Sequence, residues 1–116
     1  MTQEGTLSPE ATKPVGIEFD REGRRLLFDW ADGRRSAFEW EFLRWRCPCA
    51  FCAGEGDLPG ALEGRTSLRP EEIEMTDVNL VGRYAVQPTW KDGHDDGLFT
   101  FRGLRAYAEQ NNLHLA

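Results

Sequence analysis

The feature that most constrains the fold is a stretch that occurs twice along the chain. Residues 30–44, WADGRRSAFEWEFLR, and residues 90–105, WKDGHDDGLFTFRGLR, both run from Trp through Asp-Gly to an aromatic strand and end in Leu-Arg. Asp-Gly tolerates the positive φ that tight hairpin turns require. The repeat therefore predicts two strand–turn–strand–helix units. If the copies pack with approximate two-fold symmetry, the end of the first comes close to the turn of the second; alternatively, Asp-Gly hairpins simply recur.

Hydrophobic alternation and turn signals predict an α+β fold, with a small mixed or antiparallel sheet of about five or six strands and two short helices. The first helix is expected in EWEFLRWR, because Phe38, Phe42 and Trp45 recur at helical spacing. The final helix is expected over residues 100–112, with Thr100 as its N-cap. The strands are expected at residues 15–20, 24–30, 34–38, 73–82, 83–90 and 98–101.

Length and composition predict one domain. A chain of 116 residues accommodates a single modest core, and residues 15–112 are expected to form it. Residues 1–14 are polar and rich in Thr, Glu and Pro, so we expect a disordered tail there. Residues 53–70 are rich in Gly and Pro, which predicts a flexible loop.

Charge and hydropathy argue against two classes of partner. The net charge is −6, from 20 acidic and 14 basic residues, whereas a nucleic-acid binder needs a basic face. No apolar run approaches the roughly 20 residues that cross a membrane, and the N-terminus has no apolar signal-peptide core. We therefore expect a cytoplasmic protein that binds neither nucleic acid nor membrane. In that reducing compartment, clustered cysteines more often bind metal or do redox chemistry than form disulfides.

The three cysteines of the chain lie within RCPCAFC, as Cys47, Cys49 and Cys52. Zinc takes four S or N ligands in a tetrahedron, so a fourth ligand is expected from elsewhere in the chain. His94 lies in the second Asp-Gly turn, whereas His114 lies near the C-terminus, where fraying is common. His94 is therefore the expected fourth ligand. A closed Cys3His site of this kind would be structural rather than catalytic.

The cysteine spacing leaves other interpretations open. Three free thiols without metal, a redox pair of Cys49 and Cys52, and an iron–sulfur cluster with three Cys and one His are the alternatives. His94, Asp96 and His114 could also mimic the two-His-one-carboxylate iron site of oxygenases. No phosphate-binding Gly loop, GxSxG motif or Ser-His-Asp order stands out in the sequence. Nothing in it therefore indicates an active site.

Taken together, W-x-DG, FLRWRCPCAFC and VGRYAVQPTWKDGHDDGLFTFRGLR resemble the gamma-butyrobetaine hydroxylase-like N-terminal domain, over roughly residues 15–110. Members of that family are the N-terminal domains of gamma-butyrobetaine and trimethyllysine hydroxylases, are fused to Mrp-type iron–sulfur carrier ATPases, or are small stand-alone bacterial proteins of unknown function. In the hydroxylases the domain is a zinc module, and the resemblance implies Cys47, Cys49, Cys52 and His94 as its ligands here. The iron and 2-oxoglutarate site of the hydroxylases lies in a separate domain. The resemblance therefore does not imply hydroxylase activity.

The residues and the resemblance together predict a non-catalytic, zinc-binding accessory or interaction domain. By analogy with the fusions, the expected partner is an oxygenase or an iron–sulfur assembly component. The alternative is an accessory protein of iron–sulfur cluster assembly or transport, with iron or a cluster in place of zinc. A less favoured hypothesis is that the protein is part of an iron/2-oxoglutarate hydroxylase system.

Overall fold

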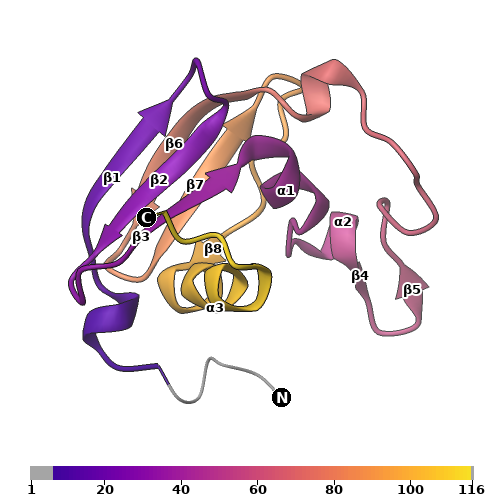
Figure 1. Ribbon diagram of the computed structural model, residues 1–116. Coiled ribbons are helices and arrows are strands. Elements are labelled where there is room, and N and C mark those ends of the chain that lie inside the picture. The colour runs from indigo at the N-terminus through magenta and orange to yellow at the C-terminus, as the bar shows by residue number, and fades with distance from the viewer. Residues whose placement is uncertain (1–6, 116) are drawn as a thin grey trace. The chain divides into compact units, whose positions relative to one another are not determined.

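The computed structural model describes residues 7–115, which group into two compact units. Unit 1 contains the residues up to Glu39 together with those from Thr100 onward, and unit 2 is Trp40–Phe99. Within residues 7–115 the fold is α+β, as predicted, with eight short strands in three small antiparallel sheets and three α-helices (Figure 1). No helix in this described stretch is long and apolar enough to cross a membrane.

The sheet of unit 1 has three antiparallel strands in the order β1 (Pro14–Asp20), β2 (Arg25–Trp30) and β3 (Arg35–Glu39). Figure 1 shows them side by side. The aromatic residues of β2 face the core: the Phe28 ring stacks on the Trp30 ring with centroids 5.4 Å apart, and both side chains are buried. Buried aromatic pairs of this kind contribute large apolar area to a core.

The helix α3 (Phe101–Asn111) completes the core of this unit. Thr100 caps its N-terminus, as predicted, because the hydroxyl accepts a hydrogen bond from the amide three residues on at 3.0 Å. The Phe101 ring meets Phe28 edge-on at 6.4 Å between centroids. After the helix, residues 113–115 pair with β3 through backbone hydrogen bonds. The chain's last described segment therefore covers the outer edge of β3.

The second half of the predicted disordered tail, residues 1–14, has ordered structure. Residues 1–6 lie outside the described part of the chain. Glu10–Thr12 form a short 3-10 helix, η2, in which Ala11 is buried. The Ala11 carbonyl accepts a hydrogen bond from the Arg105 guanidinium at 3.1 Å. A side chain from α3 thus holds backbone that composition alone assigned to the disordered segment 1–14.

In unit 2, β6 (Met75–Val81) and β7 (Ala85–Trp90) form an antiparallel hairpin. The third strand of this sheet is β8 (Phe99–Thr100), at the boundary of the unit. All three strands lie within their predicted ranges. Met75 pairs with Trp90 across the hairpin, and both are buried. The hairpin thus contributes its apolar face to the core of unit 2.

The first helix is shorter than predicted. The helix α1 spans Trp40–Trp45, one residue shorter at each end than the predicted 39–46. Phe38, which the prediction placed both in the strand at 34–38 and on the helical face, lies in β3 opposite Leu26. The Phe38 side chain is fully buried. Phe38 fits the helical spacing to Phe42 and also the two-residue alternation of a strand, and the structure places it in the strand.

Part of the predicted loop at 53–70 has regular structure. The helix α2 (Ala50–Ala53) leads into a hairpin of two-residue strands, β4 (Gly54–Glu55) and β5 (Leu58–Pro59), and Figure 1 shows this hairpin directly after α2. A short 3-10 helix, η3 (Pro70–Glu72), follows the loop. The strands β4 and β5 and the helix α2 are the strands and helix that the structure has beyond those predicted.

Both Asp-Gly turns have the same backbone hydrogen bonds, as the repeat predicts. In each, the Trp amide donates to the carbonyl four residues on, and the Gly amide donates back to the Trp carbonyl; the distances are 2.9 and 2.9 Å in the first turn and 3.0 and 2.8 Å in the second. Gly33 and Gly93 have φ values of 90° and 91°, which favour glycine. Unit 1 contains the first turn and α3, whereas unit 2 contains the second turn and α1. Each unit therefore combines the turn of one copy with the helix of the other.

Candidate metal centre

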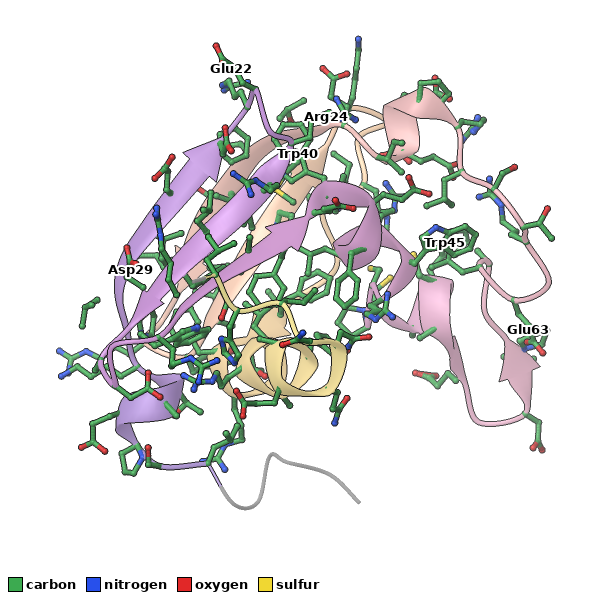
Figure 2. All side chains as sticks on the ribbon, in the orientation of Figure 1. Glu22, Arg24, Asp29, Trp40, Trp45 and Glu63 are labelled. Atoms are coloured by element: carbon green, nitrogen blue, oxygen red, sulfur yellow. The ribbon has the colours of Figure 1, made fainter. Side chains whose placement is uncertain are left out.

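Cys47, Cys49 and Cys52 lie where the chain passes from α1 into α2, and Figure 2 shows sulfur atoms beside these helices. The Cys47 amide donates to the Arg44 carbonyl at 3.2 Å, which continues the last turn of α1. Pro48 follows, and a proline has no amide hydrogen with which to continue a helix. Cys49 is the N-cap of α2, and its Sγ accepts a hydrogen bond from the Cys52 amide at 3.4 Å. Local backbone geometry thus brings all three thiols together.

The second Asp-Gly turn brings His94 to these thiols. Its Nε2 lies 3.3, 3.6 and 3.4 Å from the Sγ atoms of Cys47, Cys49 and Cys52, respectively. The Sγ atoms of Cys47 and Cys49 are 3.5 Å apart, and the four ligand atoms all lie within 4.8 Å of one another. Cys47 and Cys52 are buried, whereas Cys49 and His94 are half-buried.

These distances fit one four-coordinate ion. A tetrahedral zinc ion with bonds of about 2.3 Å to sulfur and about 2.1 Å to nitrogen requires S···N separations of about 3.6 Å and S···S separations of about 3.8 Å. The observed S···N distances of 3.3 to 3.6 Å lie close to the first value. Three thiolates and one imidazole also form a donor set that zinc accepts. The four side chains can therefore hold a metal ion.

The three thiols do not ionise equally. Burial raises the pKa of Cys47. Burial also raises the pKa of Cys52, and the neighbouring Cys49 and Cys47 thiols raise it further. Burial acts on Cys49 in the same direction, but hydrogen bonds from the Cys52 amide and from both neighbouring thiols outweigh it and lower the pKa of Cys49. Like charges at such short range disfavour three thiolates together, so a bound cation would compensate a real electrostatic cost.

Two glycines allow backbone to approach the cysteines closely. A Cβ atom at Gly97 would lie 2.7 Å from Cys47 Sγ. A Cβ atom at Gly60 would lie 2.1 Å from the Cys52 carbonyl oxygen, and the residue after Gly60 donates its amide to the Phe51 carbonyl at 2.8 Å. The β4–β5 hairpin is thus held directly on α2. Neither glycine could be recognised from the sequence, because each contact joins segments that are separate in the sequence.

A pocket of about 470 Å³ opens beside the cluster. Cys52 and His94 line the pocket on the side of the cluster, and Phe51, with 71% of its surface exposed, lines it as well. Arg65 and Glu72 contribute another part of the lining and form two hydrogen bonds of 2.7 and 2.8 Å. The Arg65 guanidinium holds the pKa of Glu72 well below its usual range. One side of the cluster therefore faces a cavity bounded by a fixed ion pair.

The other histidine has different partners. His114 Nδ1 lies 3.0 Å from Ser36 Oγ, and its Nε2 hydrogen-bonds the Glu109 carboxylate, both within unit 1. Within the described part of the chain, the Cys3His cluster is the one group of three or more metal-ligating side chains that converges. The four predicted ligands come together within unit 2.

Comparison with known proteins identifies the family. A family model described as gamma-butyrobetaine hydroxylase-like, N-terminal, matches residues 17–105. The chain belongs to this family. The match confirms the resemblance that the repeated Trp-x-Asp-Gly motif and the cysteine motif indicated. This member of the family carries a Cys3His cluster that could bind a metal.

Solved structures of similar chains agree with this assignment. A crystal structure of a protein of unknown function from Acidithiobacillus ferrooxidans, which belongs to the DUF971 family, is 36% identical, with a TM-score of 0.61 over 84% of this chain and 94% of that chain. Two NMR solution structures are 25% and 26% identical, with TM-scores of 0.57 and 0.63. They cover 86% and 90% of this chain and 75% and 76% of their own. A search of curated proteins found no match.

Proposed function

We propose that this chain is a non-catalytic zinc-binding domain that serves a protein partner as an accessory or interaction module. The observation that carries the proposal is the convergence of three thiols on one imidazole nitrogen, with all four ligand atoms within 4.8 Å. This donor set and this spacing favour tetrahedral zinc. Protein side chains would fill all four positions, which leaves none for a substrate and favours a structural role.

A structural ion would stabilise unit 2 in particular. The cysteines and His94 are 42 to 47 residues apart in the sequence. One ion would therefore close a long loop, much of which has only two- to four-residue elements. A preformed site of this kind rarely exists in the unfolded chain, so the free energy of metal binding adds to the free energy of folding.

Two exposed apolar side chains near the cluster support the interaction role. Phe51 on α2 is 71% exposed, and Leu58 on β5 is 72% exposed. Gly60 holds the β4–β5 hairpin on α2, so these side chains belong to one connected part of unit 2. Contiguous exposed apolar surface often marks a protein-binding site, and Phe51 and Leu58 are the side chains that we propose contribute to such a surface. We propose an oxygenase or an iron–sulfur assembly component as the partner, on the analogy of the fused family members.

The first test is the metal content of purified protein, measured by elemental analysis together with an absorption spectrum recorded without oxygen. The proposal expects about one zinc per chain and no visible colour, as for a closed structural site. Iron with acid-labile sulfide and absorption near about 400 nm would overturn it in favour of iron–sulfur cluster handling. A folded protein with no metal would also contradict it.

Ligand variants test the structural role separately. Cys49→Ser and His94→Ala should lose zinc and melt at a lower temperature, because the binding energy is also folding energy. His114→Ala is the matched control and should retain zinc, since its side chain contacts Ser36 and Glu109 instead. Loss of zinc at an unchanged melting temperature would show that the ion does not support the fold.

A further inference from the structure

An ion pair between a buried arginine and a turn aspartate fixes the turn that carries His94. Arg44 donates to both carboxylate oxygens of Asp92 at 3.1 and 3.0 Å, and the Arg44 side chain is only 5% exposed. The same Asp92 Oδ1 accepts the backbone amide of His94 at 3.2 Å. Arg44 also lies over the Trp90 ring, 5.3 Å from its centroid, and donates to the Glu72 carbonyl at 2.8 Å. The turn is thereby attached to α1.

The same arrangement occurs in unit 1 without a metal ligand. Arg105 donates to both carboxylate oxygens of Asp32 at 3.1 and 2.8 Å, and its side chain is also 5% exposed. It lies 5.8 Å from the centroid of the Trp30 ring. Asp32 Oδ1 accepts the amide of Arg34 at 3.1 Å. Arg34 is exposed and stands at the turn position that His94 occupies in unit 2.

We propose that Arg44 and Asp92 are a positioning pair for the metal ligand His94, an inference that rests on the proposed zinc site. One carboxylate oxygen binds the Arg44 guanidinium and the His94 amide together, so the backbone of His94 is fixed relative to α1. Cys47 follows the end of α1 by two residues. The pair therefore sets the imidazole and the first thiol relative to one another.

The expected size of this effect follows from the narrow geometry of metal sites. Ligand distances in such sites hold to within about 0.2 Å. A turn released from α1 would move His94 by more than this on average. Removing a group that orients a metal ligand typically weakens metal binding by about 10- to 100-fold. We expect a loss in that range when the pair is broken.

The Arg105–Asp32 pair of unit 1 is a control that distinguishes an effect on the position of His94 from an effect on protein stability. Both pairs are bidentate and both arginines are buried, so breaking either one leaves a buried charge unpaired and destabilises the protein. Only the turn in unit 2 carries a predicted ligand. A loss of metal affinity that follows Asp92 and not Asp32 therefore reports positioning of His94.

The test is Co²⁺ binding to the full chain, measured by competition with a chelator of known affinity and by the visible absorption of the bound ion. Asp92→Ala and Arg44→Lys should bind Co²⁺ about 10- to 100-fold more weakly and show shifted absorption bands. Asp32→Ala and Arg105→Lys should melt at lower temperature but keep the wild-type affinity and spectrum. If Asp92→Ala does not fold, Asp92→Asn replaces it; its amide oxygen can still accept from His94, so its loss of affinity should be smaller.

The remaining outcomes would overturn either the positioning role alone or the proposed zinc site as well. Wild-type affinity and an unchanged spectrum in Asp92→Ala and Arg44→Lys would overturn the positioning role and leave the zinc site intact. Equal losses of affinity in Asp92→Ala and Asp32→Ala would also overturn it, because the effect would then follow general stability. A wild-type chain that binds neither Co²⁺ nor Zn²⁺ would overturn the proposed function, and the positioning role with it.

Discussion

Replacing Gly97 with Ala should weaken metal binding while the protein remains folded. The added Cβ atom would lie 2.7 Å from Cys47 Sγ and 3.3 Å from Pro48 Cδ. Restoring an ordinary contact of 3.4 Å requires the sulfur to move by about 0.7 Å. Metal–ligand distances vary by only about 0.2 Å. Cys47 therefore cannot keep both its place in the ligand set and an unstrained contact with the new methyl group.

The cost of this substitution should fall on binding rather than on folding. Gly97 does not have a positive φ, so Ala fits its backbone and stabilises by about 0.4–1 kcal/mol through the unfolded state. Overpacking costs about 1–3 kcal/mol, and in the metal-free chain the Cys47 side chain can rotate away from the contact. The metal-free stability should therefore change by less than about 3 kcal/mol. Zinc affinity should fall by more than the roughly 10- to 100-fold typical of groups that only orient a ligand.

Two measurements check this prediction. Chelator competition gives the zinc affinity, and thermal unfolding of the metal-free protein gives its stability. Gly16→Ala in β1 is the control. Its Cβ would lie 3.2 Å from the Asp29 carboxylate, and the nearest atoms around it all belong to Asp29 and not to a cysteine. The control should keep the wild-type zinc affinity. If Gly97→Ala also keeps that affinity and an unchanged Co²⁺ spectrum, the reasoning from close contact at Cys47 is refuted.

Three further substitutions test other contacts. Glu72→Gln should make the melting temperature less dependent on pH in acid. The Arg65 guanidinium lowers the pKa of Glu72 in the folded protein. The ionised carboxylate therefore stabilises the fold fully above the unfolded pKa of about 4.3, and this stabilisation is lost as the pH falls through the lower folded pKa. Equal slopes of melting temperature against pH below about pH 5 in both proteins would contradict this. Ser36→Ala should cost about 1–3 kcal/mol in urea unfolding, because its hydroxyl accepts from the buried Trp30 Nε1 at 2.9 Å; a negligible cost would mean that the indole finds another acceptor. Gly60→Ala should lower the melting temperature and shift the amide resonances of α2, because its Cβ would meet a carbonyl oxygen of α2 at 2.1 Å; unchanged resonances would contradict that contact.

The main strands could be predicted because their signals are local. All six predicted strands form, with ends within two residues of the expected ones, since alternation and Asp-Gly turns act over a few residues. Phe38 shows the limit of this reasoning, because its neighbours fit a helix and a strand equally well. The strands β4 and β5 are too short to alternate. Their pairing depends on close backbone contacts at Gly54 and Gly60, which composition suggests only as a loop.

The candidate site could be predicted in part for a similar reason. The three cysteines lie within six residues, and the repeat indicated that the second turn, with His94, could approach them. The sequence does not reveal that the copies exchange helices. Each copy has an Asp in its Trp-x-Asp-Gly turn and ends in Leu-Arg on its helix, so pairing within a copy looks equally reasonable. The structure pairs Arg44 with Asp92 and Arg105 with Asp32 instead, a choice made by tertiary packing.

The two units differ in what orders them, and this difference shows what a metal ion bound in unit 2 would contribute. In unit 1, the Phe28 ring packs against Phe38 of the adjacent strand and against Phe101 of α3, and residues 113–115 cover the edge of β3. In unit 2, the long connection from α2 to β6 buries little apolar surface, and its described polar contacts centre on Glu72. Ordering such a segment costs backbone entropy of about 1–2 kcal/mol per residue. An ion bound to cysteines at one end of unit 2 and to His94 near the other would offset part of that cost, whereas the apolar core of unit 1 requires no such link.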